Sequence, residues 1–124
     1  MKFPDKLDVL AIHARLIAET GGSAGLRDEG ALESALTAGE NRQYYEGADL
    51  ATCAATYAYH LSQAHAFIDG NKRIAVAVSE TFLEVNGARL EMTNDEIVEL
   101  FLSIAAGRLT RDNVEKVFQA RITM

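Results

Sequence analysis

Apolar residues recur every three or four positions through most of this chain, and that spacing marks one face of an α-helix. Residues 5–19 carry two such apolar stripes, and the pair Gly21-Gly22 then interrupts the pattern. Two stripes predict a first helix that is buried on a wide face. No long segment alternates between apolar and polar residues as a half-buried strand does, so the pattern predicts an all-α protein.

The second helix and the segment after it are marked by glycine and by a loss of period. Asp28 is placed to accept hydrogen bonds at the start of a short helix, and Gly39 is placed to close that helix. Residues 40–49, which include Tyr44 and Tyr45, are polar and have no helical period. The sequence therefore predicts a loop after Gly39.

The middle of the chain predicts two buried helices. Residues 50–66 are rich in alanine, and residues 70–86 are apolar nearly all round before Gly87 ends the pattern. Residues 50–68 form the longest stretch without a formal charge, yet polar side chains such as His60 interrupt it. A membrane span would exclude those groups, so the stretch predicts a buried helix of a soluble protein.

The last third of the chain predicts one short strand and two helices. Residues 88–92 are the candidate strand. Thr93 and Glu96 have the spacing of a capping box at the start of a fifth helix, and Thr110 is placed to cap a sixth. No linker or repeat divides the chain, so we expect a single domain over residues 1–124, built as a compact bundle of about six helices.

Composition narrows the class of protein further. Hydrophobic residues make up 48% of the 124 residues, so the chain can hold a core without disulfides or metals. Its net charge of −6 makes direct nucleic-acid binding an unexpected function. Cys53 is the only cysteine, which excludes an internal disulfide and predicts a small buried residue. The first residues lack the apolar run of a signal peptide, so we expect a cytoplasmic protein without membrane association.

The strongest chemical signal is the junction of the third and fourth predicted helices, residues 65–73, which read HAFIDGNKR. A helix N-terminus offers unpaired backbone N–H groups and a partial positive charge, so its first turn normally carries acids. Here the first turn carries Lys72 and Arg73, and a bound anion would offset their unfavourable placement. Gly70 lets a ligand approach the backbone closely, and Asn71 adds a neutral amide. These residues together predict a phosphate-binding cradle.

Two further groups stand beside this cradle. His65, at the end of an apolar helix, can take a proton from a hydroxyl group, and Asp69 can bind a magnesium ion together with phosphates. A simpler interpretation makes Asp69 an ordinary N-cap and leaves both bases in solvent. A base, a metal ligand and an anion cradle within nine residues favour an enzyme site over that interpretation.

These residues resemble the motif of the Fic/Doc family, which reads His-x-Phe-x-Asp-(Gly or Ala)-Asn-(Gly or Lys)-Arg. The chain matches its seven specified positions, namely His65, Phe67, Asp69, Gly70, Asn71, Lys72 and Arg73. Residues 12–36 are also similar to the death-on-curing (Doc) toxins of that family, so the resemblance covers most of the chain. It implies a compact bundle of about six helices, which agrees with the periodicity.

Two positions assign the resemblance to the Doc branch. Where AMP-transferring Fic enzymes have a second glycine and a further arginine, this chain has Lys72 and Val76. The lysine would crowd one phosphate pocket, and the valine removes a guanidinium clamp. The Doc branch implies a toxin that transfers phosphate from ATP to a protein hydroxyl. A threonine of elongation factor Tu is the implied acceptor, and arrest of translation is the implied result.

The resemblance also implies a role for each residue of the motif. His65 would be the general base, Asp69 would bind Mg²⁺ and orient the acceptor, and Phe67 would anchor the loop in the core. The phosphates of ATP would be held by Gly70, Asn71, Lys72 and Arg73. The predicted loop with Tyr44 and Tyr45 would correspond to the flap that registers the target peptide in Fic proteins.

Other functions stay open. A Fic-type AMP or nucleotidyl transferase uses the same motif on a protein hydroxyl. A catalytically inactive binding or regulatory module is a second alternative, because Ile74 stands where Doc-type proteins tend to carry threonine. A metal hydrolase is disfavoured, since His60 and His65 are five residues apart and point about 140° apart on a helix. His13, on the first helix, is interpreted as a packed or capping residue.

Regulation is expected to come from another chain. Fic proteins often carry an inhibitory motif, Ser/Thr-x-x-x-Glu-(Gly or Asn), and no Glu-Gly or Glu-Asn pair here has Ser or Thr at the required position. The resemblance therefore implies a separate antitoxin whose disordered tail folds as a helix on the toxin. We expect its groove beside the motif, lined by the first helix and residues 40–49.

Overall fold

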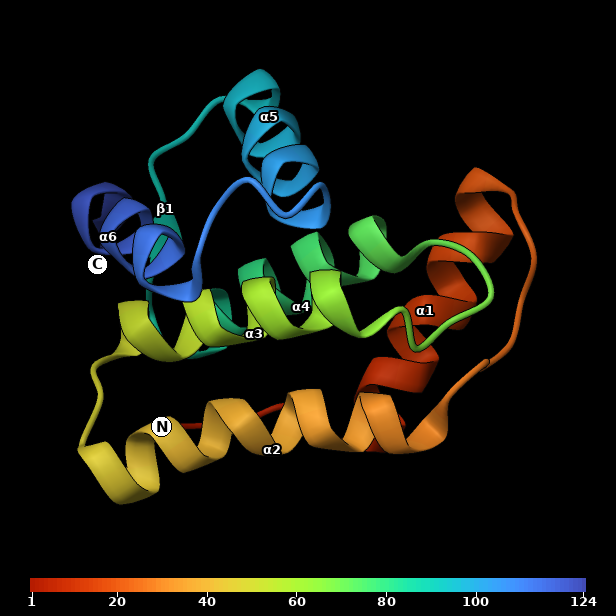
Figure 1. Ribbon diagram of the computed structural model, residues 1–124, viewed down its shortest axis with the longest axis horizontal. Helices are drawn as coiled ribbons and strands as arrows, with labels where there is room; N and C mark the ends of the chain where they lie inside the picture. The colour runs from red at the N-terminus through yellow and green to blue at the C-terminus, as the bar shows by residue number, and fades with distance from the viewer.

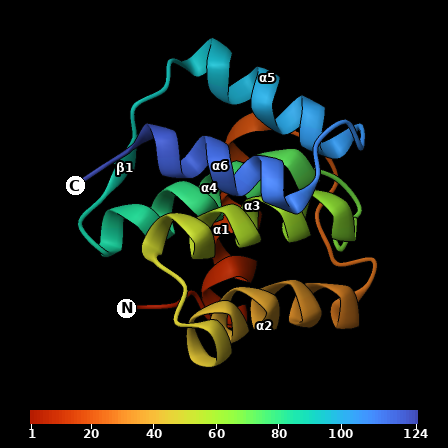
Figure 2. The same ribbon diagram turned by 60° about the vertical axis from the view of Figure 1, so that its left-hand side comes forward.

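The computed structural model describes residues 1–124 and contains six α-helices and one two-stranded sheet. In chain order the elements are α1 (Lys6–Thr20), α2 (Glu29–Glu46), α3 (Leu50–Ala64), α4 (Asn71–Val85), β1 (Arg89–Leu90), α5 (Asn94–Ala105), α6 (Arg111–Arg121) and β2 (Ile122–Thr123). Helix α3 lies in the middle and packs against α2, α4, α5 and α6 (Figure 1). Figure 2 shows α5 and α6 on one side of α3 and α2 on the other. The predicted all-α bundle is confirmed.

The composition of α3 explains its central place. Every residue from Ala51 to Ala58 is buried, and most of these side chains are small, so the neighbouring helices approach α3 closely. Cys53 lies within this run, and burial raises the pKa of its thiol to about 11. The prediction that Cys53 is a buried residue is therefore confirmed. None of the helices combines the length and the apolar character that a membrane crossing requires.

Most helix ends follow the predicted caps. The Thr93 hydroxyl accepts a hydrogen bond from the Glu96 N–H (3.2 Å), and Glu96 Oε1 accepts one from the Thr93 N–H (2.9 Å). Thr110 caps α6 by the same arrangement. The expected strand over residues 88–92 is present as the shorter β1, which pairs antiparallel with β2. The sequence pattern did not reveal β2, because a strand of two residues has no period.

The predicted end of the second helix is wrong. Helix α2 continues through Gly39 to Glu46, so residues 40–46 are helical and only residues 47–49 form a connection. Gly39 is required for a different reason, because a Cβ there would lie 2.3 Å from Cζ of the buried Tyr57 ring. The helix ends at Gly47, which has the left-handed φ of 62° typical of a C-cap glycine.

This correction moves Tyr44 and Tyr45 onto the last turns of α2. Their side chains are 77% and 75% exposed, and their rings contact each other edge to face. In Figure 1 the C-terminal end of α2 (yellow) and the connection from α3 to α4 (green) lie at opposite sides of the molecule. The docking role of the two tyrosines stays a prediction, but they lie on a helix at a distance from the motif and not on a loop beside it.

Gly39→Ala is expected to destabilise the protein although alanine is the better helix former. The added methyl group would enter the buried Tyr57 ring, and overpacking of that kind costs about 1–3 kcal/mol of unfolding free energy. Gly30→Ala is the matched control, because a Cβ at Gly30 in the same helix meets only Asp28 Oδ1, at 3.6 Å. That control should gain up to about 1 kcal/mol. Urea denaturation measures both changes, and a Gly39→Ala protein as stable as Gly30→Ala would contradict the packing argument.

Candidate active site

The connection from α3 to α4 carries the candidate site. Helix α3 ends at Ala64, slightly earlier than predicted, and His65 follows with φ 47° and ψ 43°. His65 is the only residue other than glycine that has a positive φ. This left-handed conformation costs about 1–2 kcal/mol for a residue with a Cβ, so the surrounding structure must hold it. The turn leaves the His65 side chain exposed.

Phe67 and Asn71 hold this connection from within. The Phe67 side chain is buried in the core, as the resemblance implies. Asn71 Oδ1 accepts a hydrogen bond from the Phe67 N–H (3.0 Å), and Asn71 Nδ2 donates to the Phe67 carbonyl (2.9 Å). Both ends of the amide are therefore engaged, which gives Asn71 a loop-fixing role beside the phosphate-binding role that the resemblance implies.

Residues 21–28, between α1 and α2, run beside the motif. The Ile68 N–H donates to the Gly25 carbonyl (3.1 Å), and the Arg27 N–H donates to the Ala66 carbonyl (2.7 Å). These bonds are strand-like, and an isolated antiparallel bridge forms between the two segments. The motif is thus supported along one side by backbone that lies far from it in the sequence.

The segment beside the motif is not the one that the sequence analysis expected. Residues 40–49 were expected beside the motif, but they lie in α2 and its short connection to α3. Residues 21–28 could have been identified as the segment beside the motif by their high content of glycine. Gly21, Gly22 and Gly25 all have positive φ. Backbone with such glycines turns sharply and approaches other groups closely.

Asp69 is not the N-cap of α4, because Gly70 occupies that position and no side chain caps the helix. The carboxylate instead accepts hydrogen bonds from the Ser23 N–H (3.2 Å) and the Gly70 N–H (2.8 Å). These two bonds lower the pKa of Asp69, and the nearby Arg73 guanidinium adds to the effect. Asp69 is therefore ionised at neutral pH, beside a helix start whose N–H groups have no side-chain cap.

Arg73 joins the motif to the end of α1. Its guanidinium donates to the Thr20 hydroxyl and to the Gly21 carbonyl (2.8 Å), and its Nη2 lies 3.5 Å from Asp69 Oδ1. The planar fork is therefore already oriented before any ligand binds. A phosphate bound here would meet a preformed guanidinium.

These side chains line a cleft of about 410 Å³, within the range of small-molecule sites. His65 and the consecutive residues 69–73 form most of its wall, which Ser62, Ile68 and Ala105 complete. The structure thus brings the predicted site residues together, except for Tyr44 and Tyr45 at the far end of α2 and Phe67 in the core.

Ile74, which departs from the Doc-type pattern, does not belong to the cleft. Its side chain is 1% exposed and packs in the core. The departure therefore removes no polar group from the cleft wall, and it gives little support to a module that has lost its chemistry.

His13 is a packed residue, as the sequence analysis interpreted it. Its side chain is buried, and its ring stacks on Phe67 with 3.8 Å between centroids. Its Nε2 also lies 2.8 Å from the backbone carbonyl oxygen of Asp69. Sequence spacing did not reveal this contact, which joins α1 directly to the motif.

The donor groups of the cleft fit a magnesium ion shared with phosphates. Mg²⁺ is usually held by one or two carboxylates, while waters and substrate phosphates complete its shell. Asp69 offers one ionised carboxylate that is 46% exposed. No cluster of three or more His, Cys, Asp or Glu side chains forms a cage made by the protein alone.

Comparisons with known proteins show the family of this chain. The sequence profile of the Fic/DOC family matches residues 3–83, which include the whole motif and the segments that support it. The chain is 31% identical over 108 residues to "Protein kinase doc" of Escherichia phage P1, across 86% of this chain and 85% of that protein. It is 39% identical over 93 residues to "Toxin Doc" of Mycolicibacterium smegmatis, across 72% of this chain and 68% of that protein.

Proposed function

The chain belongs to the Fic/DOC family as a protein of the Doc type, and from this premise we propose that it is a toxin that phosphorylates a protein hydroxyl. The donor is ATP, which loses its γ-phosphate, and the acceptor is a serine or threonine of a translation factor. Elongation factor Tu is the acceptor that the Doc resemblance implies, with arrest of translation as the result. Such a substrate places the activity in the cytoplasm.

The observation that carries this proposal is the shared cleft. His65 from the end of α3 and residues 69–73 at the start of α4 line the same space of about 410 Å³. Phosphoryl transfer requires little covalent chemistry from a protein, and it depends on positioning and on neutralising phosphate charge. A base beside an uncapped, positively charged helix start supplies both requirements.

His65 is the proposed general base. Its exposed imidazole accepts the proton of the acceptor hydroxyl as the hydroxyl oxygen bonds to the γ-phosphorus. The bond from that phosphorus to the bridging oxygen breaks, and ADP leaves with the electron pair. The proton on His65 then passes to solvent. The left-handed backbone at His65 fixes the direction in which its side chain leaves the chain, and so its position relative to the phosphates that would bind at residues 69–73.

The rest of the motif holds the donor. Lys72 and Arg73 add positive charge to the N-terminus of α4, whose N–H groups have no side-chain cap and would face the phosphate oxygens. A magnesium ion at Asp69 would neutralise part of the phosphate charge. The Ser23 and Gly70 N–H groups keep the Asp69 carboxylate ionised and oriented.

Two residues favour transfer of the terminal phosphate over transfer of AMP. Lys72 is exposed and lines the cleft, at the position where AMP-transferring Fic enzymes are expected to have glycine. Val76 stands at the position of their second arginine and packs against the core. The cleft therefore has one guanidinium and one ammonium group, which matches the Doc arrangement.

Labelled ATP tests the proposal directly. Cell extract is incubated with the protein and with ATP labelled at either the α or the γ position. We expect one extract protein to take up γ-label alone and to gain the mass of one phosphate. Uptake of α-label with the mass of AMP would replace the proposal with a nucleotidyl transferase. The absence of both labels would favour an inactive binding module.

Gly22→Ala is expected to weaken ATP binding although Gly22 does not line the cleft. A Cβ at Gly22 would lie 2.4 Å from Asp69 Oδ2 and 3.1 Å from Arg73 Nη2, so both side chains would have to move. Gly21→Ala is the control, because both glycines have positive φ but a Cβ at Gly21 meets nothing within 4 Å. Calorimetry should give about tenfold weaker binding for Gly22→Ala than for Gly21→Ala. Equal affinities would show that the cradle tolerates displacement of this pair.

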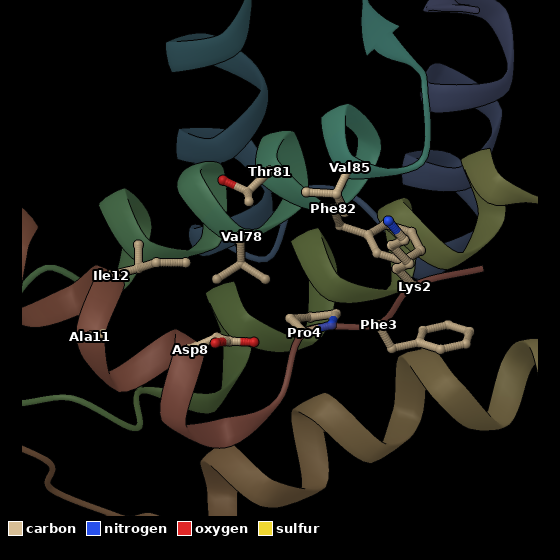
Figure 3. A pocket seen from close by; sticks show the side chains of 10 residues that line it. All are labelled: Lys2, Phe3, Pro4, Asp8, Ala11, Ile12, Val78, Thr81, Phe82 and Val85. Atoms are coloured by element: carbon tan, nitrogen blue, oxygen red, sulfur yellow. The ribbon is translucent and has the colours of Figure 1, made fainter.

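We also propose that a separate antitoxin restrains this protein. An apolar groove of about 480 Å³ lies between the N-terminal segment, α1 and α4 (Figure 3). Ile12 on α1 and Val78 on α4 face the same space in Figure 3, with Phe3 at one side. An amphipathic helix buries its apolar face in a groove of this kind. Like the groove expected from the resemblance, this groove is lined by the first helix, but it includes none of residues 40–49 and none of the residues that line the cleft at the motif.

Val85→Glu is expected to weaken antitoxin binding by at least about tenfold and to leave phosphate transfer unchanged. Val85 lines the groove and is 51% exposed, so the substitution places a charge in the contact without disturbing the core. Val98→Glu is the control, because Val98 is 57% exposed on α5 and lies outside the groove. Calorimetry with the product of the neighbouring open reading frame measures binding. Equal weakening by both substitutions would contradict this placement of the antitoxin.

A further inference from the structure

A buried histidine from α1 reaches the backbone of the motif. His13 is 3% exposed, and its Nε2 lies 2.8 Å from the carbonyl oxygen of Asp69, 56 residues away in the sequence. We propose that His13 is a positioning residue, which fixes the turn from Asp69 to Gly70 and thereby aims the Asp69 carboxylate into the cleft. The inference rests on the proposed function only where it assigns Mg²⁺ and ATP to that cleft.

The chemistry of the contact determines which atom carries the proton. A backbone carbonyl oxygen only accepts hydrogen bonds, so Nε2 of His13 must be the donor. The carboxylate of the same aspartate accepts from the Ser23 and Gly70 N–H groups. Asp69 is thus held at its carbonyl by α1 and at its carboxylate by the two segments beside it, which leaves little freedom for the side chain.

The ring of His13 cannot turn away from this contact. It stacks on Phe67 at 3.8 Å between centroids with 15° between the ring planes. Phe67 is itself buried, and its backbone is bonded to both ends of the Asn71 amide. A rigid stack therefore joins α1 to the first residue of α4, and the hydrogen bond of His13 is preorganised.

The same stack sets where α4 begins. Gly70, the N-cap of α4, has φ 77°, and a Cβ there would lie 3.2 Å from Ile17 Cδ1 and 3.4 Å from His13 Nε2. The first helical hydrogen bond of α4 runs from the Ile74 N–H to the Gly70 carbonyl (2.9 Å). If the turn loosened, that bond would weaken. The Asp69 carboxylate would then be free to move toward Arg73, which is 3.5 Å away.

Two substitutions separate hydrogen bonding from stacking. His13→Gln carries an amide nitrogen as many bonds from Cα as Nε2 is in histidine, so it keeps a donor and loses the ring. His13→Phe keeps the ring and leaves the Asp69 carbonyl without its partner. A role in packing alone predicts that phenylalanine is tolerated better. A positioning role predicts that glutamine is tolerated better.

Amide hydrogen exchange at Ile74 reads the state of the turn without any activity. We expect exchange to be about tenfold faster in His13→Phe and close to wild type in His13→Gln. His13→Asn is the control for side-chain length. Its amide nitrogen is only as many bonds from Cα as Nδ1 is in histidine, so it cannot reach the Asp69 carbonyl, and the variant should behave like His13→Phe. The comparison of Gln with Asn carries the test if His13→Phe does not fold. Wild-type exchange in a folded His13→Asn protein would overturn the proposal.

Binding and turnover supply the second readout. Calorimetry with a non-hydrolysable ATP analogue and Mg²⁺ should show the same order of variants as the exchange rates. The kcat of transfer should fall about 10–100-fold in His13→Asn, while the KM for the acceptor stays unchanged. If the wild-type protein transfers no phosphate but the exchange order holds, the proposed function fails and the positioning role stands. If transfer is present and glutamine is no better than asparagine, the positioning role alone fails.

Discussion

His65→Ala is expected to lower the rate of γ-phosphate transfer by about 10²–10⁴-fold, which is the usual cost of removing a positioned general base. The His65 side chain is exposed and lies at the end of α3, so no core contact is lost with it. ATP binding should be nearly unchanged, because the proposed phosphate contacts belong to residues 69–73, which line the cleft. The loss should therefore appear in kcat and not in affinity.

The left-handed backbone at His65 requires its own control. Asparagine tolerates this conformation better than other residues with a Cβ, so His65→Asn keeps the turn while removing the base. Both variants should fold as judged by circular dichroism, and both should abolish growth arrest when expressed without a partner. A His65→Asn protein that still arrests growth at wild-type levels would contradict the assignment of the base.

Most helix ends of this fold could be predicted because they depend on residues close in the sequence. Asp28, Thr93 and Thr110 each cap a helix by accepting a hydrogen bond from an N–H group within its first turn, and Thr93 forms its capping box with Glu96. The motif could be recognised for the same reason, since its base, carboxylate and cations fall within nine residues. Local spacing therefore predicted the bundle and the reactive groups.

The length of α2 could not be predicted, because the deciding contact is not local. Glycine is the residue type typical of a helix end, yet Gly39 lies inside α2, where the helix crosses the Tyr57 ring of α3. Only glycine fits between the helix backbone and that ring. A glycine that serves close packing and one that serves a turn look identical in a single sequence.

The contacts that hold the motif in place could not be predicted from the sequence, because they too join residues that are distant along the chain. Thr20, Ser23 and His13 bond to motif residues that lie 46 to 56 positions away in the sequence, through a hydroxyl, a backbone N–H and an imidazole. A backbone N–H has no sequence signature at all, so the contact from Ser23 could not be inferred from residue type. His13 offered a weak signal, as a polar residue on an apolar helix face.

These contacts also bear on the proposed phosphate-binding role of Arg73. In the structure Arg73 already bonds to Thr20 and Gly21 and stands beside Asp69. The guanidinium therefore loses little conformational entropy when a phosphate binds. Lys72 is exposed and has a flexible stem, so it must be ordered by the ligand. Neighbouring cations of equal charge should consequently contribute unequally to ATP affinity.

Arg73→Ala is expected to weaken ATP binding by about 10–100-fold, since a hydrogen bond to a charged group contributes roughly 1.5–3 kcal/mol. Lys72→Ala should weaken it only a few-fold, on the order of an exposed ion pair. Arg73→Lys keeps the charge without the planar fork and should recover part of the loss. Thr20→Val tests whether the contacts that orient Arg73 matter. It removes one hydrogen bond of the Arg73 guanidinium and should have a smaller effect than Arg73→Ala. Calorimetric titration with ATP and Mg²⁺ measures all four variants, and equal affinity of wild type and Arg73→Ala would remove the phosphate cradle from the proposed mechanism.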